Sequence, residues 1–317
     1  MITLETPRTT TSERAIAYRT KGHGGGPITR LMSPGHVGEM VKPFVFLDHF
    51  DFAGPSDGGP VHPHSGIATH TTLLEGSLIY GDSTGKSGSL RRGGVEWMRA
   101  GGGVWHGGTL PAGRIRGFQL WVALEAPLEL APAESHYVDV SSIPSDGKAR
   151  VLLGSYGELQ SLVPYPQPVT YLNVKLSDGE RWTYRPHTTH DVAWLAVSLG
   201  TLRVAGALVG REMVLFEEGS QRIEVVAEGK VDFVIASAVK HPHPLVTGMY
   251  SVHTSPKNLM IGESGIRDVA SSMSLIPWRP LAESLGEGAS VCMPRPRAVT
   301  SPSGEARASP VAGRRHR

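Results

Sequence analysis

Short apolar runs separated by glycine and proline constrain this chain more than any other feature. The 317 residues include 39 glycines and 24 prolines, and only 19% of the residues are charged. Runs such as Val41–Phe52, Thr69–Leu74 and Val192–Ser198 have the length of strands, whereas long segments with helical periodicity are rare. The pattern predicts an all-β protein whose short strands form barrels of the jelly-roll type.

The rhythm of strand, glycine turn and strand occurs in both halves of the chain. We therefore expect a duplicated barrel, with one domain over residues 13–127, a second over residues 128–290 and a tail over residues 291–317. A minor helix is expected only late in the second domain, as one or two turns at Asn258–Ile261 and Arg267–Leu275.

The net charge of +2 is unevenly distributed along the chain. The segment Met293–Arg317 contains six arginines and one acidic residue, Glu305, so the tail is basic and the rest of the chain is acidic. Because the tail is rich in Pro, Ser, Ala and Gly and lacks apolar periodicity, we expect it to be disordered. We interpret it as a solvated extension rather than an arm that binds nucleic acid.

Two further absences in the sequence bear on location. No run of about eighteen apolar residues and no hydrophobic N-terminal segment is present, so we expect neither a membrane span nor a secretory signal. The single cysteine, Cys292, excludes an internal disulfide and a cysteine-based zinc site. Both observations favour a cytoplasmic protein.

The tripeptide His62-Pro63-His64 is the first candidate for a functional motif. Residues two apart on a strand face the same way, so both histidines can aim their imidazoles at one point. A third ligand has to come from another strand, and His106 is the natural candidate because the glycine run Gly101–Gly103 would let the backbone carry it across the barrel. Three imidazoles suit a transition metal rather than calcium or magnesium. The alternative is that these histidines are ordinary polar residues of strands.

Five motifs, taken in order, resemble the pirin family. They are Val45–Phe50, His62–Gly66, Leu73–Ser77, Val95–His106 and Leu120–Val122, and the resemblance extends over roughly residues 13–275. It implies a bicupin, in which two cupin barrels pack face to face. It also implies that the N-terminal barrel binds one metal ion, usually iron, and that the C-terminal barrel binds none.

The resemblance also assigns the ligands of this ion. The three metal histidines of the family fall on His62, His64 and His106, which makes Fe(II) the expected ion and Zn, Ni, Cu and Mn the alternatives. The fourth ligand of the family, a glutamate, falls on Gly108, and a second acidic position typical of cupins falls on Ala68. Both carboxylates are missing, which leaves positions on the ion open to water, an anion or a bidentate substrate.

Two other residues are candidates for a catalytic role. His70 shares a strand face with His64 if the strand is regular, and it could be a ligand or a proton acceptor; the alternative is a buried polar histidine. Glu96 could approach from a neighbouring strand as a base, and its alternative is an exposed or turn-paired carboxylate. An apolar wall for an aromatic ligand, or plain barrel core, is predicted for Trp97, Met98 and Trp105.

The resemblance implies two possible functions. One is an Fe(II)-dependent dioxygenase that resembles quercetin 2,3-dioxygenase and brings a flavonol, or another aromatic or enol substrate, together with dioxygen. The other is a non-enzymatic protein that senses metal or redox state and acts through a protein partner. No organic cofactor is expected in either case.

Overall fold

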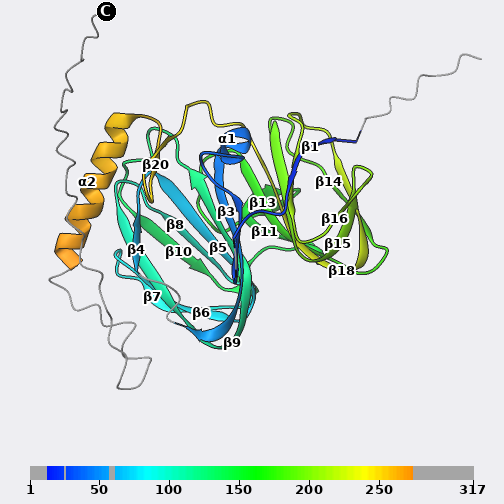
Figure 1. The fold of residues 1–317 in the computed structure, drawn as a ribbon, viewed down its shortest axis with the longest axis horizontal. Helices are drawn as coiled ribbons and strands as arrows, with labels where there is room; N and C mark the ends of the chain where they lie inside the picture. The colour runs from blue at the N-terminus through cyan, green and yellow to red at the C-terminus, as the bar shows by residue number, and fades with distance from the viewer. Residues whose placement is uncertain (1–12, 25, 57–60, 274–317) are drawn as a thin grey trace, which may run out of the picture.

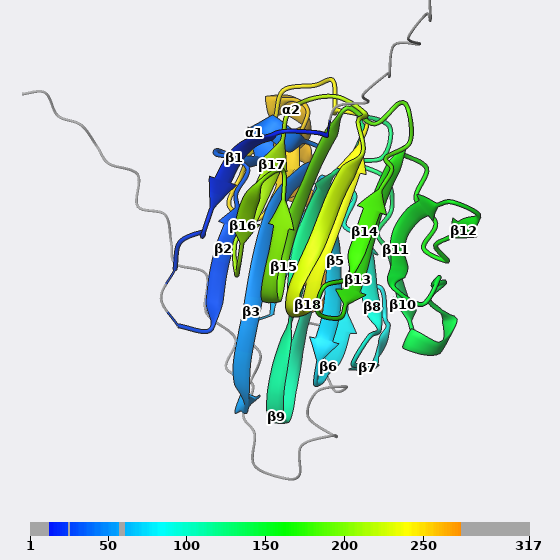
Figure 2. The same cartoon turned by 90° about the vertical axis from the view of Figure 1, so that its right-hand side faces the viewer.

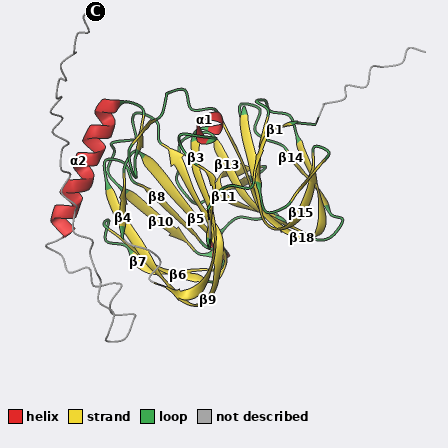
Figure 3. Cartoon of the chain, viewed as in Figure 1, coloured by secondary structure: helices red, strands yellow, loops and turns green. Residues whose placement is uncertain are grey.

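The computed structural model describes residues 13–24, 26–56 and 61–273. Two large antiparallel sheets, one from each half of the chain, curl into barrels that lie side by side (Figure 1). Strands dominate the described residues, and the long helix lies along the outer side of the first barrel (Figure 3). The predicted all-β class with a late helix is confirmed. The predicted tail, residues 291–317, lies outside the described residues.

The first sheet contains nine strands in the order β10-β8-β5-β9-β3-β2, with β4 and β6 paired to β9 and β7 paired to β6. Their bounds are β2 (Ile28–Met32), β3 (Phe44–Ser56), β4 (His62–His64), β5 (Ile67–Glu75), β6 (Ser77–Asp82), β7 (Ser87–Arg91), β8 (Val95–Arg99), β9 (Val104–Ala123) and β10 (Glu134–Val138).

The second sheet also contains nine strands, in the order β1-β17-β15-β18-β13-β11-β12, with β14 paired to β18 and β16 paired to β15. Their bounds are β1 (Ile16–Thr20), β11 (Ala149–Tyr156), β12 (Leu159–Gln160), β13 (Val169–Leu176), β14 (Arg181–Tyr184), β15 (Val192–Val204), β16 (Ala207–Val209), β17 (Met213–Phe216) and β18 (Ile223–Ala238). Figure 2 shows these strands face on, with the first sheet behind them.

The two sheets exchange strands near the predicted domain boundaries. Strand β1 pairs with β17 of the second sheet, although it precedes the whole first sheet in the chain. Strand β10 pairs with β8 of the first sheet, although it follows residue 127. The domain ranges 13–127 and 128–290 stay a prediction. The strand at the start of the first range, β1, pairs with the second barrel, and the strand near the start of the second range, β10, pairs with the first barrel.

The strand predicted by the apolar run Val192–Ser198 continues beyond that run. Val192–Ser198 and Leu202–Val204 are both parts of β15, whose pairing with β18 shifts in register on both sides of Leu199. Gly200 has a φ of +81°, and a Cβ at this position would lie 2.3 Å from the carbonyl oxygen of Lys230. Glycine therefore allows a bulge that bends the strand without ending it.

Two helices and a small hairpin complete the secondary structure of the described residues, apart from a short 3-10 turn at Val140–Ser142. They are α1 (Gly38–Val41), α2 (Pro256–Met273) and the hairpin of β19 (Val246–Thr247) and β20 (Val252–His253). Helix α2 begins where Ser255 accepts a hydrogen bond from the backbone N–H of Asn258 and Pro256 occupies the first turn. It contains the predicted turn Asn258–Ile261 and residues 267–273 of the second predicted turn, whose last two residues lie outside the described residues. In the described residues no helix is long and apolar enough to cross a membrane.

One continuous apolar core joins the two barrels. It combines Phe44, Trp97 and Leu120 of the first sheet with buried side chains of the second sheet, which include Tyr171, Trp194 and Val234. The rings of Phe44 and Trp194 meet edge to face across the boundary at a centroid distance of 5.5 Å. The barrels therefore depend on each other for burial of their facing sides.

Truncation of Phe44 should test this dependence. The Phe44→Ala variant removes a fully buried ring at the boundary, so the free energy of unfolding should fall by about 3–5 kcal/mol. The matched control is Leu199→Ala, because Leu199 is 50% exposed and its loss should change stability by no more than about 0.5 kcal/mol. Urea denaturation measures both values, and similar small losses would show that the barrels fold independently.

Candidate metal centre

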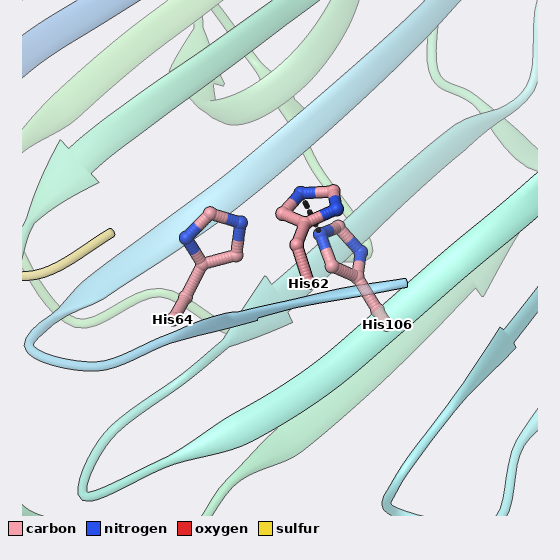
Figure 4. Close-up of side chains that lie close together, drawn as sticks. All are labelled: His62, His64 and His106. Atoms are coloured by element: carbon pink, nitrogen blue, oxygen red, sulfur yellow. Dashed lines mark hydrogen bonds between the residues drawn. The ribbon is translucent and has the colours of Figure 1, made fainter. Parts of the chain in front are cut away.

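The pairing of β4 with β9 brings three histidines together. His62 lies directly opposite His106 in the antiparallel register, and His64 lies opposite Val104. Because alternate residues share a face, His62 and His64 present their rings on the same side as His106 (Figure 4). His106 was expected to come from across the barrel; instead it comes from the adjacent strand, because the turn after Ala100 returns the chain directly alongside β4.

The ring nitrogens of the three histidines converge. One nitrogen from each ring lies within 4.8 Å of the others, and no further His, Cys, Asp or Glu of the described residues joins this group. The Nε2 atoms of His62 and His106 are 3.1 Å apart. Two donors at about 2.1 Å from one ion and at right angles to each other would be about 3.0 Å apart, so this spacing fits a shared metal ion.

Hydrogen bonds orient two of the three rings. His64 Nδ1 lies 3.0 Å from the carbonyl oxygen of Tyr250, and His106 Nδ1 lies 3.1 Å from Oε1 of Glu96. Both acceptors favour a proton on Nδ1, which leaves the lone pair on Nε2. An acceptor behind the ligating imidazole is the usual arrangement around a metal ion.

His64 has the environment of a neutral ligand. Its side chain is fully buried, and its Nε2 has no hydrogen-bond partner. Burial, together with the neighbouring imidazoles of His106 and His62, holds the pKa of His64 well below its usual value. A buried acceptor without a partner is costly, and a metal ion on the lone pair of Nε2 would remove that cost. The donor set therefore fits a transition-metal ion.

Glu96 supplies a negative charge behind His106. Its side chain is buried, and the hydroxyl of Thr71 donates a second hydrogen bond to it. Burial acts to raise the pKa of Glu96, but the hydrogen bonds from His106 and Thr71 and the charge of His106 outweigh it and lower the pKa. The ionised carboxylate can therefore balance part of the charge of an ion bound at Nε2 of His106. A role for Glu96 as a base stays a prediction.

Gly108 lies on β9 where the pirin resemblance places a glutamate ligand. A Cβ at this position would lie 2.7 Å from the carbonyl oxygen of Ile79 and 2.7 Å from Cδ1 of Leu78. Strand β6 therefore occupies the space that a side chain at this position would need. The site therefore lacks the fourth protein ligand, and no space is left at Gly108 for the Cβ of such a ligand.

His70 lies outside the histidine group. Its Nε2 is 3.4 Å from the carbonyl oxygen of Leu152, and its ring meets Tyr171 of the second sheet edge to face at 5.1 Å. Burial lowers its pKa to about 4, so the ring is neutral at the boundary between the barrels. The structure therefore places His70 among the contacts that join the barrels, and its catalytic role stays a prediction.

Of the two alternatives predicted for Trp97, Met98 and Trp105, the structure shows barrel core for Trp97 and Met98 rather than a wall beside the histidines. Trp97 packs in the core between the barrels, Met98 is buried in the core of the first barrel, and Trp105 donates from Nε1 to the carbonyl oxygen of Ile266 in α2. The ring that meets His64 is Trp121, at a centroid distance of 4.8 Å. Alternation along β9 from His106 points to Leu120 and Val122 instead, because an extra residue between Leu110 and Gly113 shifts the register with β3 and reverses which side chains face inward.

Tyr250 was not predicted by any local pattern. Its ring centroid lies 5.9 Å from that of His62 and 6.1 Å from that of His64, and it reaches the site only because β19 and β20 fold back on the first barrel. A cavity of about 230 Å³ lies next to this segment, lined by Trp121, Phe46 and residues 247–249. Trp121 thus borders both the cavity and His64.

The comparisons with known proteins agree with this geometry. The sequence model of the pirin family, described as Pirin, matches residues 27–122. A Pseudomonas aeruginosa protein, provisionally named quercetin 2,3-dioxygenase, is 35% identical over 243 residues, which cover 70% of this chain and 84% of the relative. The chain belongs to the pirin family.

Solved structures show that this pirin has the bicupin fold. A crystal structure of quercetin 2,3-dioxygenase from Acinetobacter baumannii matches with a TM-score of 0.70 at 22% identity, covering 82% of this chain and 96% of that protein. A bacterial pirin from Escherichia coli, YhhW, crystallised in complex with nickel(II), matches with a TM-score of 0.55 at 17% identity, covering 72% and 98%.

Removal of the charge on Glu96 should weaken metal binding. The Glu96→Gln variant keeps an acceptor for His106 Nδ1 but loses the negative charge, so Fe(II) affinity should fall about 10–100-fold while the fold is retained. The matched control is Glu212→Gln, which neutralises a buried carboxylate paired with Arg19 in the second barrel. Anaerobic Fe(II) titration measures both, and unchanged affinity in Glu96→Gln would contradict a role for this charge.

Proposed function

We propose that this pirin binds one Fe(II) ion through His62, His64 and His106 and promotes the reaction of a flavonol, or another aromatic enol, with dioxygen. The observation that supports this best is the convergence of three imidazole nitrogens, two of them on rings oriented by acceptors at Nδ1. Imidazole donors also suit Zn, Ni and Cu, and the nickel complex of the Escherichia coli pirin supports a divalent transition ion in this fold.

The chain provides two features that suit such a reaction, and it lacks a third. When bound, the ion would supply Lewis-acid and redox chemistry to substrate and dioxygen. Three protein ligands leave positions open, and the space at Gly108 is closed, so the protein offers no carboxylate there to accept the hydroxyl proton of the substrate. Trp121 and the 37% exposed Tyr250 place aromatic surface beside the histidines, which suits a planar substrate and excludes water.

A cytoplasmic location suits this proposal. A reducing compartment keeps iron in the ferrous state, and the sequence predicts such a compartment from its single cysteine. The names of the Pseudomonas and Acinetobacter proteins support the flavonol as the first substrate to test.

A second candidate function is regulation through a protein partner that responds to the metal or its redox state. It is favoured by the side chains of Met249 and Met260, which are 83% and 73% exposed on the segment that also carries Tyr250. Methionine-rich surfaces adapt to partners, and this one adjoins the metal centre. Identical binding of a partner in ferrous and ferric protein would count against it.

Oxygen uptake distinguishes the two functions. The Fe(II)-loaded protein should consume oxygen when quercetin is added, and His64→Ala should lose this uptake because it removes a buried ligand. His187→Ala is the control, since His187 is an exposed histidine of the second barrel. An oxygen electrode makes the measurement, and uptake that is the same without quercetin or in His64→Ala would refute the dioxygenase.

A further inference from the structure

The C-terminal part of the described chain closes over the two strands that carry the histidines. Residues 246–273, which comprise β19, β20 and α2, form a cap on the outer side of the first barrel (Figure 1). The cap touches each strand beside a histidine: Ser251 bridges Ser65, the neighbour of His64, and Ile266 accepts a hydrogen bond from Trp105, the neighbour of His106.

A buried polar chain fastens this cap. His253 Nε2 lies 3.0 Å from the hydroxyl of Ser65, and His253 Nδ1 lies at ion-pair distance, 3.2 Å, from Oε2 of Glu129 without a hydrogen bond between them. Glu129 also accepts hydrogen bonds of 2.7 Å and 2.6 Å from the backbone N–H and the hydroxyl of Thr254. It accepts a further one from Asn258 in the first turn of α2, where a carboxylate is favoured by the helix dipole.

Ser65, His253 and Glu129 contact one another in the same order as the serine, histidine and carboxylate of a hydrolytic triad, but no space for a substrate lies beside the serine. Ser65 and Glu129 have no exposed surface, and His253 is 1% exposed. Gly262 of α2 lies directly over them, so that a Cβ there would be 2.4 Å from His253 Nε2 and 2.6 Å from Ser65 Oγ. A serine sealed in this way cannot attack an ester or amide. These contacts therefore have a structural role and not a hydrolytic one.

We infer that His253 is a positioning residue for the metal centre, which it orients through the Tyr250 carbonyl. This inference rests on the proposed metal-binding function. Hydrogen bonds join Ser65 to Ser251 and to His253, and Tyr250 directly precedes Ser251 in the chain. Its carbonyl is thereby held 3.0 Å from His64 Nδ1, which keeps the proton on Nδ1 and the Nε2 lone pair toward the other histidines.

Two substitutions of His253 separate its contacts. In His253→Gln the longer amide can still reach the Ser65 hydroxyl, whereas the shorter amide of His253→Asn can reach only Glu129. We expect His253→Gln to resemble the wild type and His253→Asn to release the Tyr250 carbonyl from His64. The matched control is His190→Asn, which removes a 3% exposed histidine bonded to Ser237 in the second barrel.

The first readout needs no metal. In metal-free protein labelled with ¹⁵N-histidine, the NMR signals of His64, assigned by their loss in His64→Gln, should show one tautomer protonated at Nδ1. This state should persist in His253→Gln and His190→Asn and become a mixture of tautomers in His253→Asn. A single Nδ1 tautomer in His253→Asn, equal to that of the wild type, would overturn the inference.

The second readout is Co(II) affinity, followed by the visible absorption of the bound ion. It should weaken about 10-fold in His253→Asn and remain unchanged in His253→Gln and His190→Asn. If the wild type binds no Co(II), the proposed metal function fails. The tautomer of His64 in metal-free protein still tests whether His253 positions the His64 ring. If His253→Asn does not fold, Ser65→Ala removes the same hydroxyl contacts, and an unchanged His64 tautomer in that folded variant would overturn the inference.

Discussion

The antiparallel register of β4 and β9 is the constraint on which the candidate metal centre depends. It sets His62 against His106 and, through strand alternation, adds His64 on the same face. A shift of one residue would turn both β4 histidines to the other face of the sheet. The surrounding structure protects this register, because β6 pairs with β9 from His106 to Thr109 and the cap fixes the end of β4 through Ser65.

The electrostatics of this pirin differ from those that the family resemblance implies. At Gly108 the chain has closed the space of a carboxylate ligand, while Glu96 places a carboxylate behind the imidazole of His106. The negative charge would therefore lie one layer further from a bound ion. A site of this kind keeps its ligands neutral and its open positions accessible, and it controls charge through hydrogen bonds rather than through direct coordination.

The sequence predicted those features that local patterns encode. The β class followed from short apolar runs between glycines. The pairing of His62 with His64 followed from alternation on a strand, and His106 was added by the glycine run before it and by the pirin resemblance. Contacts between distant segments were not predictable: Tyr250 meets His64, and His253 meets Ser65 and Glu129, only because the cap folds back on the first barrel, and no periodicity indicates that path. The bend at Gly200 was not predictable either, because a glycine bulge and a turn look alike in sequence.

The central claim is that three histidines without a carboxylate ligand hold a transition-metal ion. Elemental mass spectrometry of protein purified without a nickel resin, with His106→Ala beside the wild type, tests it most directly. The account predicts about one ion per chain in the wild type, mainly iron, and its loss in the variant. No metal in either protein, even after anaerobic reconstitution with Fe(II), would contradict it.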